Sequence, residues 1–284
     1  MPDIYASITA ADPATLERLV AALELRAADL LQRGILKDFV SEITLPKDAK
    51  VLEIGCGTGA VTRFLADLPQ VSQALGVEAS PVFIAKAREL AGEAQNLTFQ
   101  EADGRTLPCE DCSFDSVLFH TSLCHIPKPE EALAEAFRVL NPGGSLAIFD
   151  GDYATTSVAI GNFDPLQCCA DAAIDGFVHD RWLVRRLPAM LRASGFEPAR
   201  SRSYGYTSLP EPSYMFTLVD RGADLLLTGG RIGPGLADAL KAEARRRAEV
   251  HRFYGLIMLR VCSHAGPFSQ CYVCLWPCAP RAST

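Results

Sequence analysis

The segment that most limits how this chain can fold is a short apolar strand, residues 50–54, that runs directly into a glycine-rich turn and a helix. The turn reads Gly55-Cys56-Gly57-Thr58-Gly59, and helical spacing of apolar residues resumes over residues 60–67. Because glycine lacks a Cβ, such a turn brings the backbone close to a ligand, and the helix start presents free N–H groups to it. The turn predicts a ligand site, although a tight connection without a ligand and a dinucleotide-type turn fit the same residues.

Strands and helices alternate through the first half of the chain. Further strands are predicted at 74–78, 97–100, 116–120 and 145–150, and further helices at 81–90 and 130–140. Strands separated by helices imply right-handed crossovers and a sheet covered on both faces. The pattern therefore predicts an α/β fold with a doubly wound, mainly parallel sheet.

Helical segments are predicted on both sides of this alternation. An N-terminal helix with Asp12 as its N-cap is followed by a second helix over 28–43, which Gly34 is expected to weaken. Beyond residue 150 the pattern predicts helices at 167–174, 182–194, 212–227 and 234–261, and strands at 198–206 and 268–276. We expect seven strands, with a helical cap inserted near the end of the sheet.

Composition excludes several classes of protein. Twenty-seven basic against 34 acidic residues give a formal net charge of −7, which disfavours a broad nucleic-acid-binding face. No apolar stretch approaches the length of a membrane span, and residues 1–5 do not resemble a secretory signal. We therefore expect a cytoplasmic protein with a small-molecule partner, no nucleic acid and no membrane, as a monomer or homodimer, with reduced cysteines.

Two carboxylates follow neighbouring strands. Glu78 ends the second predicted strand, about 20 residues beyond the turn, where a carboxylate can accept both hydroxyls of an adenosine ribose. Asp103, before Gly104, follows the third strand, where it can meet an adenine amino group. Each can also be a plain strand-end or turn residue, but together they favour an adenosine-containing ligand.

The chain resembles the class I S-adenosylmethionine-dependent methyltransferases, specifically the methyltransferase type 11 group typified by ubiquinone and menaquinone biosynthesis enzymes. The resemblance covers about residues 50–150 and lies in the glycine turn, Gly76-Val77-Glu78-Ala79-Ser80, Ala102-Asp103-Gly104, Phe114-Asp115-Ser116-Val117, His125-Ile126-Pro127-Lys128-Pro129 and Arg138-Val139-Leu140-Asn141-Pro142-Gly143-Gly144. It implies a Rossmann-like methyltransferase fold with S-adenosyl-L-methionine as cofactor. The expected units are an N-terminal segment closing over the cofactor (1–47), a cofactor-binding core (48–150), and the rest of the sheet with a substrate cap (151–284).

The resemblance also implies a set of cofactor-binding residues. Gly55, Cys56 and Gly57 are implied to line the methionine part of the cofactor, and Glu53 to steady the turn and the amino end of the cofactor. Glu78 is implied to bind the ribose, Ala79 to pack beside the adenine, and Asp103 with Gly104 to meet the edge of the adenine. His120 is implied to lie near the sulfonium. Tyr5 and Arg26 precede the core where such enzymes close over the cofactor carboxylate, although an ordinary packing role fits both residues equally well.

Methyl transfer requires an acceptor lone pair held in line, with water excluded. A hydroxyl or thiol acceptor also needs a base, and position favours His125, His120, Asp150, Asp152 and Tyr153 as candidates. Amine or acidic carbon acceptors need none. The atom methylated therefore stays open.

The cap is expected to select the acceptor. The predicted cap helices carry apolar residues that fit either contact with a hydrophobic acceptor or ordinary core packing. These residues are Met215, Phe216, Leu225, Leu226, Phe253, Tyr254 and Met258. Arg245, Arg246 and Arg247 favour a solvated helix face over a phosphate site. Two pairs of cysteines have the spacing of a four-thiolate zinc site, Cys109 with Cys112 and Cys271 with Cys274. The second pair falls in a predicted strand, where side chains three residues apart point to opposite faces, so we expect no metal.

The favoured interpretation is a small-molecule methyltransferase acting on a hydrophobic metabolite. A nicotinamide-dependent oxidoreductase fits Gly55-x-Gly57-x-x-Ala60 and the acidic strand end, but not the Asp103 turn or the bend after Asn141. A third possibility is an S-adenosylmethionine-binding protein without turnover.

Overall fold

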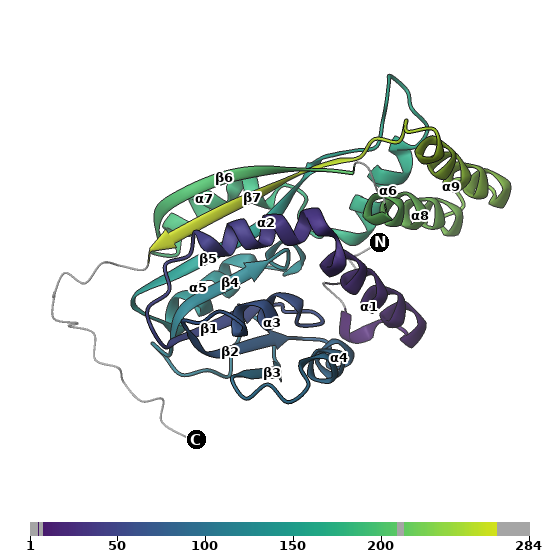
Figure 1. Ribbon diagram of the computed structural model, residues 1–284. Helices are drawn as coiled ribbons and strands as arrows, with labels where there is room; N and C mark the ends of the chain where they lie inside the picture. Colours follow the sequence, from purple (N-terminus) through teal and green to yellow (C-terminus); the bar gives the residue numbers. More distant parts are fainter. Residues whose placement is uncertain (1–4, 6–7, 209–212, 266–284) are drawn as a thin grey trace.

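Seven strands form one mixed sheet in this protein (Figure 1). The computed structural model describes residues 5, 8–208 and 213–265 of the 284-residue chain. The strands are β1 (Ala49–Ile54), β2 (Val71–Glu78), β3 (Leu97–Glu101), β4 (Phe114–His120), β5 (Leu140–Ser157), β6 (Glu197–Thr207) and β7 (Leu256–Ala265). Their order is β3-β2-β1-β4-β5-β7-β6, and β7 alone among them runs antiparallel to both of its neighbours. The predicted mainly parallel, seven-stranded α/β fold is confirmed.

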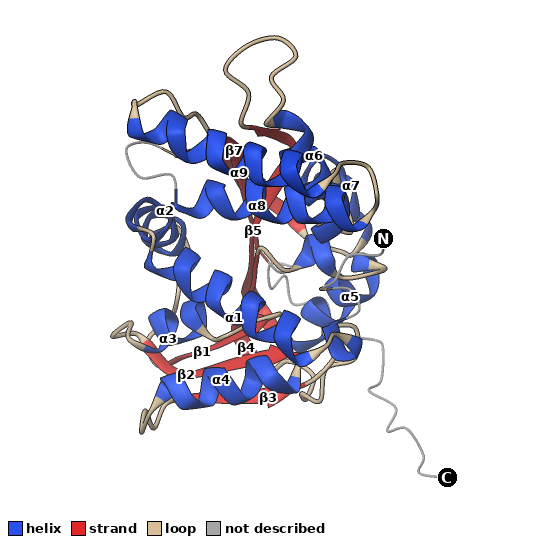
Figure 2. Cartoon of the chain, turned by 90° about the vertical axis from the view of Figure 1, so that its right-hand side faces the viewer, coloured by secondary structure: helices blue, strands red, loops and turns tan. Residues whose placement is uncertain are grey.

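Helices cover both faces of this sheet (Figures 1 and 2). They are α1 (Pro13–Ala28), α2 (Leu30–Ser41), α3 (Ala60–Ala66), α4 (Pro81–Ala91), α5 (Pro129–Val139), α6 (Gln167–Phe177), α7 (Leu183–Ala193), α8 (Ser213–Thr228) and α9 (Pro234–Glu249), with short 3-10 turns η1 (Ile8–Ala10) and η2 (Leu123–His125). Asp12 caps α1 by accepting a hydrogen bond from the Thr15 N–H, as predicted. Asp29 ends α1 and caps α2 through the Gln32 N–H, so the two helices meet at one residue.

Alternating side chains of the strands build two core layers. Val51 of β1 packs with α2 and α3 on one face, whereas Leu52 and Ile54 pack with α5 and α7 on the other. All three side chains are fully buried. This burial on both faces explains why the parallel strands read as continuous apolar runs rather than as alternating ones.

Two predictions about the second half were wrong in their extent. The helix predicted over 234–261 ends at Glu249, and Leu256–Ala265 is strand β7. Ile257, Leu259 and Val261 are buried while the residues between them are half-buried, which is the period of a strand. Strand β5 runs on to Ser157 because it pairs with β7, and the predicted strand at 268–276 lies outside the described residues.

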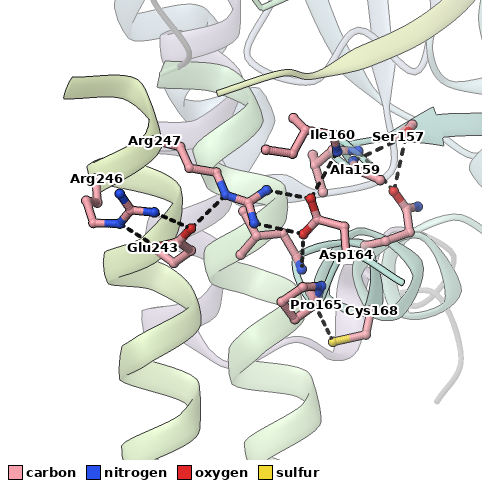
Figure 3. A network of polar contacts seen from close by, with 12 residues as sticks. Ser157, Ala159, Ile160, Asp164, Pro165, Cys168, Glu243, Arg246 and Arg247 are labelled. Carbon is pink, nitrogen blue, oxygen red and sulfur yellow. Dashed lines mark hydrogen bonds and ion pairs between the residues drawn. The ribbon is translucent and has the colours of Figure 1, made fainter. Parts of the chain in front are cut away.

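Helices α6, α8 and α9 gather at one end of the long strands β5–β7 and form the cap (Figures 1 and 2). Arg247 of α9 joins this cap to the loop after β5 by a buried ion pair with Asp164, which Figure 3 shows from close by. Of the arginines predicted to form a solvated face, Arg245 and Arg246 are exposed and paired with carboxylates, but Arg247 is buried.

Helices α6 and α8 touch backbone to backbone at a glycine of α8. A Cβ added to Gly222 would overlap the backbone carbonyl of Cys169 in α6. The backbone of α6 cannot yield as a flexible side chain could. Residue 222 therefore sets the spacing of the two helices that form one wall of the cavity described below.

Replacing Gly222 with alanine is expected to lower the free energy of unfolding by about 1–3 kcal/mol, since helices forced apart lose packing. The control is Gly34→Ala in α2, where nothing lies within 4 Å of an added Cβ. That change should raise stability by about 0.5–1 kcal/mol through helix propensity. Chemical denaturation measures both. Equal effects of the two substitutions would contradict the close contact.

Candidate functional site

A cavity of about 660 Å³ lies where the carboxyl ends of β1, β2 and β4 meet. This volume lies in the range of small-molecule sites. The residues from the sheet side of its lining include Glu53, Gly55, Cys56, Gly57, Glu78, Ala79, Asp103, Gly104, His120, Ser122 and His125. Tyr5, Leu23 and Arg26 approach from the N-terminal segment. All of the predicted cofactor-binding residues therefore lie around one cavity.

The glycine turn is held in a backbone shape that side chains disfavour. Gly55 has a φ of 74°, and a Cβ added there would lie 2.5 Å from the Cβ of Ser122. The Ser122 hydroxyl donates to the carbonyl of Ile54 at 2.7 Å, which ties the tips of β1 and β4 together. Leu23 of α1 lies over Gly57, 3.3 Å from the place of a Cβ. Leu23 of the N-terminal segment thus lies against the turn.

Glu78 fixes the turn to the tip of β2. One carboxylate oxygen accepts from the Gly57 N–H at 3.1 Å and the other from the Ser80 N–H at 3.0 Å. Burial raises the pKa of Glu78 above its usual value, although these N–H groups act in the opposite direction. Each oxygen retains a lone pair, so the side chain can also accept hydrogen bonds from hydroxyls of a ligand.

Glu53 is buried beneath the turn. The residue is 2% exposed, and its carboxyl group accepts a 2.5 Å hydrogen bond from the Thr62 hydroxyl. Burial raises the pKa of Glu53 to about 8, although the bond from Thr62 lowers it. Glu53 is therefore protonated near pH 7, and a cation placed beside it would favour its ionised form.

Asp103 lies in the loop after β3, and its side chain is 48% exposed. Its carboxylate is bound by the side chain of Arg105, with an Nη2 to Oδ2 distance of 2.6 Å. Hydrogen bonds from Arg105 hold the pKa of Asp103 below its usual range, although partial burial opposes them. Arg105 also lines the cavity, which sequence reasoning did not foresee.

Arg26 connects α1 to the tip of β4. Its guanidinium donates to Thr121 Oγ1 and to Gln32 Oε1, both at 2.6 Å. The neighbouring His120 stacks on Phe149, with centroids 4.6 Å apart and planes inclined by 7°. Burial lowers the pKa of His120 well below its ordinary value, and the charge of Arg26 adds to that effect. The imidazole of His120 is therefore neutral.

The other candidates for proton transfer divide into two groups. His125 and Tyr153 line the cavity, and the His125 ring lies 4.6 Å from that of Tyr5. Burial raises the pKa of Tyr153 well above its usual value, so its hydroxyl keeps its proton. Asp150 and Asp152 do not line the cavity. Asp150 accepts from the N–H groups of Cys124 and Gly151, and Asp152 pairs with Arg185.

A further wall of the cavity comes from α6 and α8. Its cavity-lining residues are Ala173, Ile174, Phe177, Tyr214, Thr217, Leu218 and Arg221. The sequence left two roles open for seven apolar residues of the cap, an acceptor site or core packing. None of them lines the cavity, and they are Met215, Phe216, Leu225, Leu226, Phe253, Tyr254 and Met258. Phe216 packs edge-on against Phe253 at 5.0 Å, within the core of the cap.

Neither a metal centre nor a membrane helix emerges from the described residues. No group of three or more side chains able to ligate a metal comes together within them. Of the four cysteines with zinc-like spacing, Cys271 and Cys274 lie outside the described ranges. None of the helices in residues 8–208 and 213–265 is long and apolar enough to cross a membrane.

Comparison with known proteins identifies the domain that carries this cavity. A family model described as a methyltransferase domain matches residues 52–148, from β1 into β5. The chain contains a methyltransferase domain. The resemblance to class I S-adenosylmethionine-dependent methyltransferases, drawn from the same segment, is confirmed.

Relatives and solved structures agree with this methyltransferase domain. The chain is 30% identical to the methyltransferase GfsG of Streptomyces halstedii over 58% of its own length and 54% of that protein. It is 29% identical to a demethylmenaquinone methyltransferase of Renibacterium salmoninarum over 53% of this chain and 54% of that one. The fold matches a proposed methyltransferase of Bacillus halodurans with a TM-score of 0.59 and 20% identity, covering 82% of this chain and 98% of that one. The chain spans about half the length of the curated relatives it matches.

Proposed function

We propose that this protein transfers a methyl group from S-adenosyl-L-methionine to a small-molecule acceptor. The observation that carries the proposal is the convergence of the glycine turn, Glu78 and Asp103 on one cavity inside a methyltransferase domain. These residues come from three different strands or the loops after them, and parallel strands end at the same edge of the sheet. The relatives named above, which are methyltransferases, support the same reaction.

The residues around the cavity fit the parts of this cofactor. The turn at Gly55, Cys56 and Gly57 approaches the methionine part, and Glu53 beside it suits the ammonium group. Glu78 accepts from the ribose hydroxyls, Ala79 packs by the adenine, and Asp103 with Gly104 lies at its edge. Arg26 binds the carboxylate, and Tyr5 closes the cavity beside it. The placements within the core rest on the match of each residue to the family motifs, and those of Arg26 and Tyr5 rest on their position in the lining of the cavity.

Most of the rate enhancement is expected from positioning and exclusion of water. The cofactor supplies an electrophilic methyl on a positively charged sulfur, so the chain has only to hold the acceptor in line with it. His120 and Tyr153 lie on the cavity wall, and neither side chain is charged near pH 7. We propose that His120 accepts a hydrogen bond from the acceptor and that Tyr153 donates one. His125 is the candidate for taking up a proton, while Asp152 is left out because Arg185 holds it outside the cavity.

Calorimetric titration of the full chain tests the proposal. S-adenosylmethionine and S-adenosylhomocysteine should both bind, and NAD should not, because the domain match favours the first pair over the oxidoreductase alternative. Methyl transfer to a panel of phenols, amines, thiols and quinols, followed by mass spectrometry, then separates an enzyme from a protein that binds the cofactor without turnover. Failure of both sulfur compounds to bind would refute the proposal.

Glu78→Ala should weaken binding of S-adenosylhomocysteine by about 1–3 kcal/mol, since ribose hydrogen bonds to a charged group are lost. This corresponds to a rise in Kd of roughly 5- to 150-fold. The substitution also frees the Gly57 N–H, so the turn loosens at the same time. Glu101→Ala is the matched control, because Glu101 ends the neighbouring strand opposite Glu78 but does not line the cavity. An unchanged affinity in Glu78→Ala would argue against the assignment.

A further inference from the structure

The two walls of the cavity differ in charge. The sheet side carries the carboxyl groups of Glu53, Glu78 and Asp103. The wall from α6 and α8 is largely apolar, through Ala173, Ile174, Phe177 and Leu218, with Arg221 as the charged residue among the cavity-lining residues of those two helices. A positive charge on this largely apolar wall calls for an explanation.

Arg221 is held in a fixed place on this wall. Its guanidinium carbon lies 5.1 Å from the centre of the Phe177 ring, in a cation–π contact that joins α8 to α6. Its positive charge also acts on the Tyr5 hydroxyl. Burial raises the pKa of Tyr5, although Arg221 lowers it, so the phenol is neutral near pH 7. Neither of these partners cancels the charge of Arg221.

The two acidic residues nearest to Arg221 along α8 form ion pairs with other residues. Asp220 pairs with Arg245 through contacts of 2.6 and 2.8 Å, and Asp224 pairs with Lys241 at 2.5 Å. Both partners lie on α9, so these carboxylates face the outer helix of the cap. The sequence thus places two acids beside Arg221 along α8, but the structure directs them elsewhere.

Arg26, another half-buried arginine that lines the cavity, is placed differently. It is bound to Thr121 at the tip of β4 and to Gln32 of α2, next to the turn that approaches the methionine part of the cofactor. Arg221 stands on the cap wall instead. Arg26 is therefore available to the cofactor carboxylate, and Arg221 remains for another anion. Of the other arginines that line the cavity, Arg105 is paired with Asp103 and Arg63 with Glu24.

We propose that the methyl acceptor carries a carboxylate, which Arg221 binds, and that its apolar part lies against Ile174, Phe177 and Leu218. A guanidinium stacked on a ring keeps its N–H edge directed outward, which suits two parallel hydrogen bonds to a carboxylate. This inference rests on the proposed function and narrows its substrate class from hydrophobic metabolites to amphiphilic acids.

The test uses the full chain saturated with S-adenosylhomocysteine, so that an acceptor analogue binds without reacting. The probes are benzoate, phenylacetate and octanoate, each compared with its neutral primary amide by calorimetry and thermal shift. At least one acid should bind about 10-fold or more tightly than its amide, since a charge-assisted pair is much stronger than a neutral hydrogen bond. Absence of any preference for the acids overturns the inference.

Substitutions locate the preference. Arg221→Gln should abolish the acid selectivity, Arg221→Lys should retain part of it, and affinity for S-adenosylhomocysteine should stay within about 2-fold in both, since the cofactor is held elsewhere. Arg231→Gln, at an exposed arginine beyond α8 that does not line the cavity, is the control and should behave as the parent protein. Acid selectivity that survives Arg221→Gln, or an equal loss of S-adenosylhomocysteine binding, overturns the inference. Failure of the parent protein to bind S-adenosylhomocysteine at all would instead refute the proposed function.

Discussion

Replacing Arg247 with methionine is expected to lower the free energy of unfolding by about 3–5 kcal/mol, the usual cost of leaving one partner of a buried ion pair alone. The side chains of Arg247 and Asp164 are 9% and 3% exposed, and their atoms meet at 2.6 and 3.0 Å (Figure 3). Asp164 also accepts from the N–H groups of Ile160 and Leu166. Without the guanidinium, a buried carboxylate would keep its charge with only backbone partners. Urea denaturation measures the loss.

The neighbouring arginine provides a matched control for this prediction. Arg246 pairs with Glu243, as Arg247 also does, but its side chain is 61% exposed. Arg246→Met should therefore change stability by no more than about 1 kcal/mol, as is usual for surface pairs. The double variant Asp164→Asn with Arg247→Met should lose less than the sum of its parts, because neither charge is left unpaired. If Arg247→Met costs no more than Arg246→Met, the ion pair does not anchor α9 to the loop after β5.

Local patterns were sufficient to predict the sheet, because burial on both faces gives its parallel strands distinct apolar runs. Residues 51–54 and 116–119 read as strands without any tertiary information. The same kind of apolar run explains why the sequence predicted a helix where the structure has strand β7. Leu256-Ile257-Met258-Leu259 follows a long helix, and an unbroken apolar run of this kind fits a helix or a strand equally well. Tyr254 and Gly255, which separate the two elements, were the available signal for ending the helix earlier.

The cofactor side of the cavity was predictable for a topological reason. Parallel strands end at one edge, so Gly55, Glu78 and His120 had to come together whatever the details of packing. The opposite wall follows no such rule. Phe177 and Arg221 meet only because α6 and α8 pack across Gly222, and the rotation of α8 decides whether Phe216 or Leu218 faces the cavity. A shift of one residue along a helix turns it by 100°, which the apolar pattern of this cap does not fix.

Binding of S-adenosylhomocysteine near pH 7 is expected to release close to one proton, from Glu53. Burial raises the pKa of this carboxyl to about 8, so it is mainly protonated before the ligand arrives. In the proposed site the ammonium group of the ligand lies beside it, and an adjacent positive charge favours the ionised form. Calorimetry in buffers of different ionisation enthalpy gives the number of protons released. Glu53→Gln should reduce that number to about zero, while Glu101→Gln should leave it unchanged.

The same carboxyl determines how stability depends on pH without ligand. Its pKa in the folded protein lies above the ordinary 4.5, so between about pH 4.5 and 8 the folded state binds more protons at Glu53 than the unfolded state does. The contribution of Glu53 to the free energy of unfolding therefore falls as the pH rises through that window. Glu53→Gln, which cannot ionise, should flatten this part of the profile and gain relative stability at pH 8. The prediction fails if the parent protein and Glu53→Gln show the same dependence of stability on pH and the parent releases no proton on binding. Glu53 would then be ionised throughout this pH range, and its surroundings beneath the turn would be more polar than the burial of Glu53 implies.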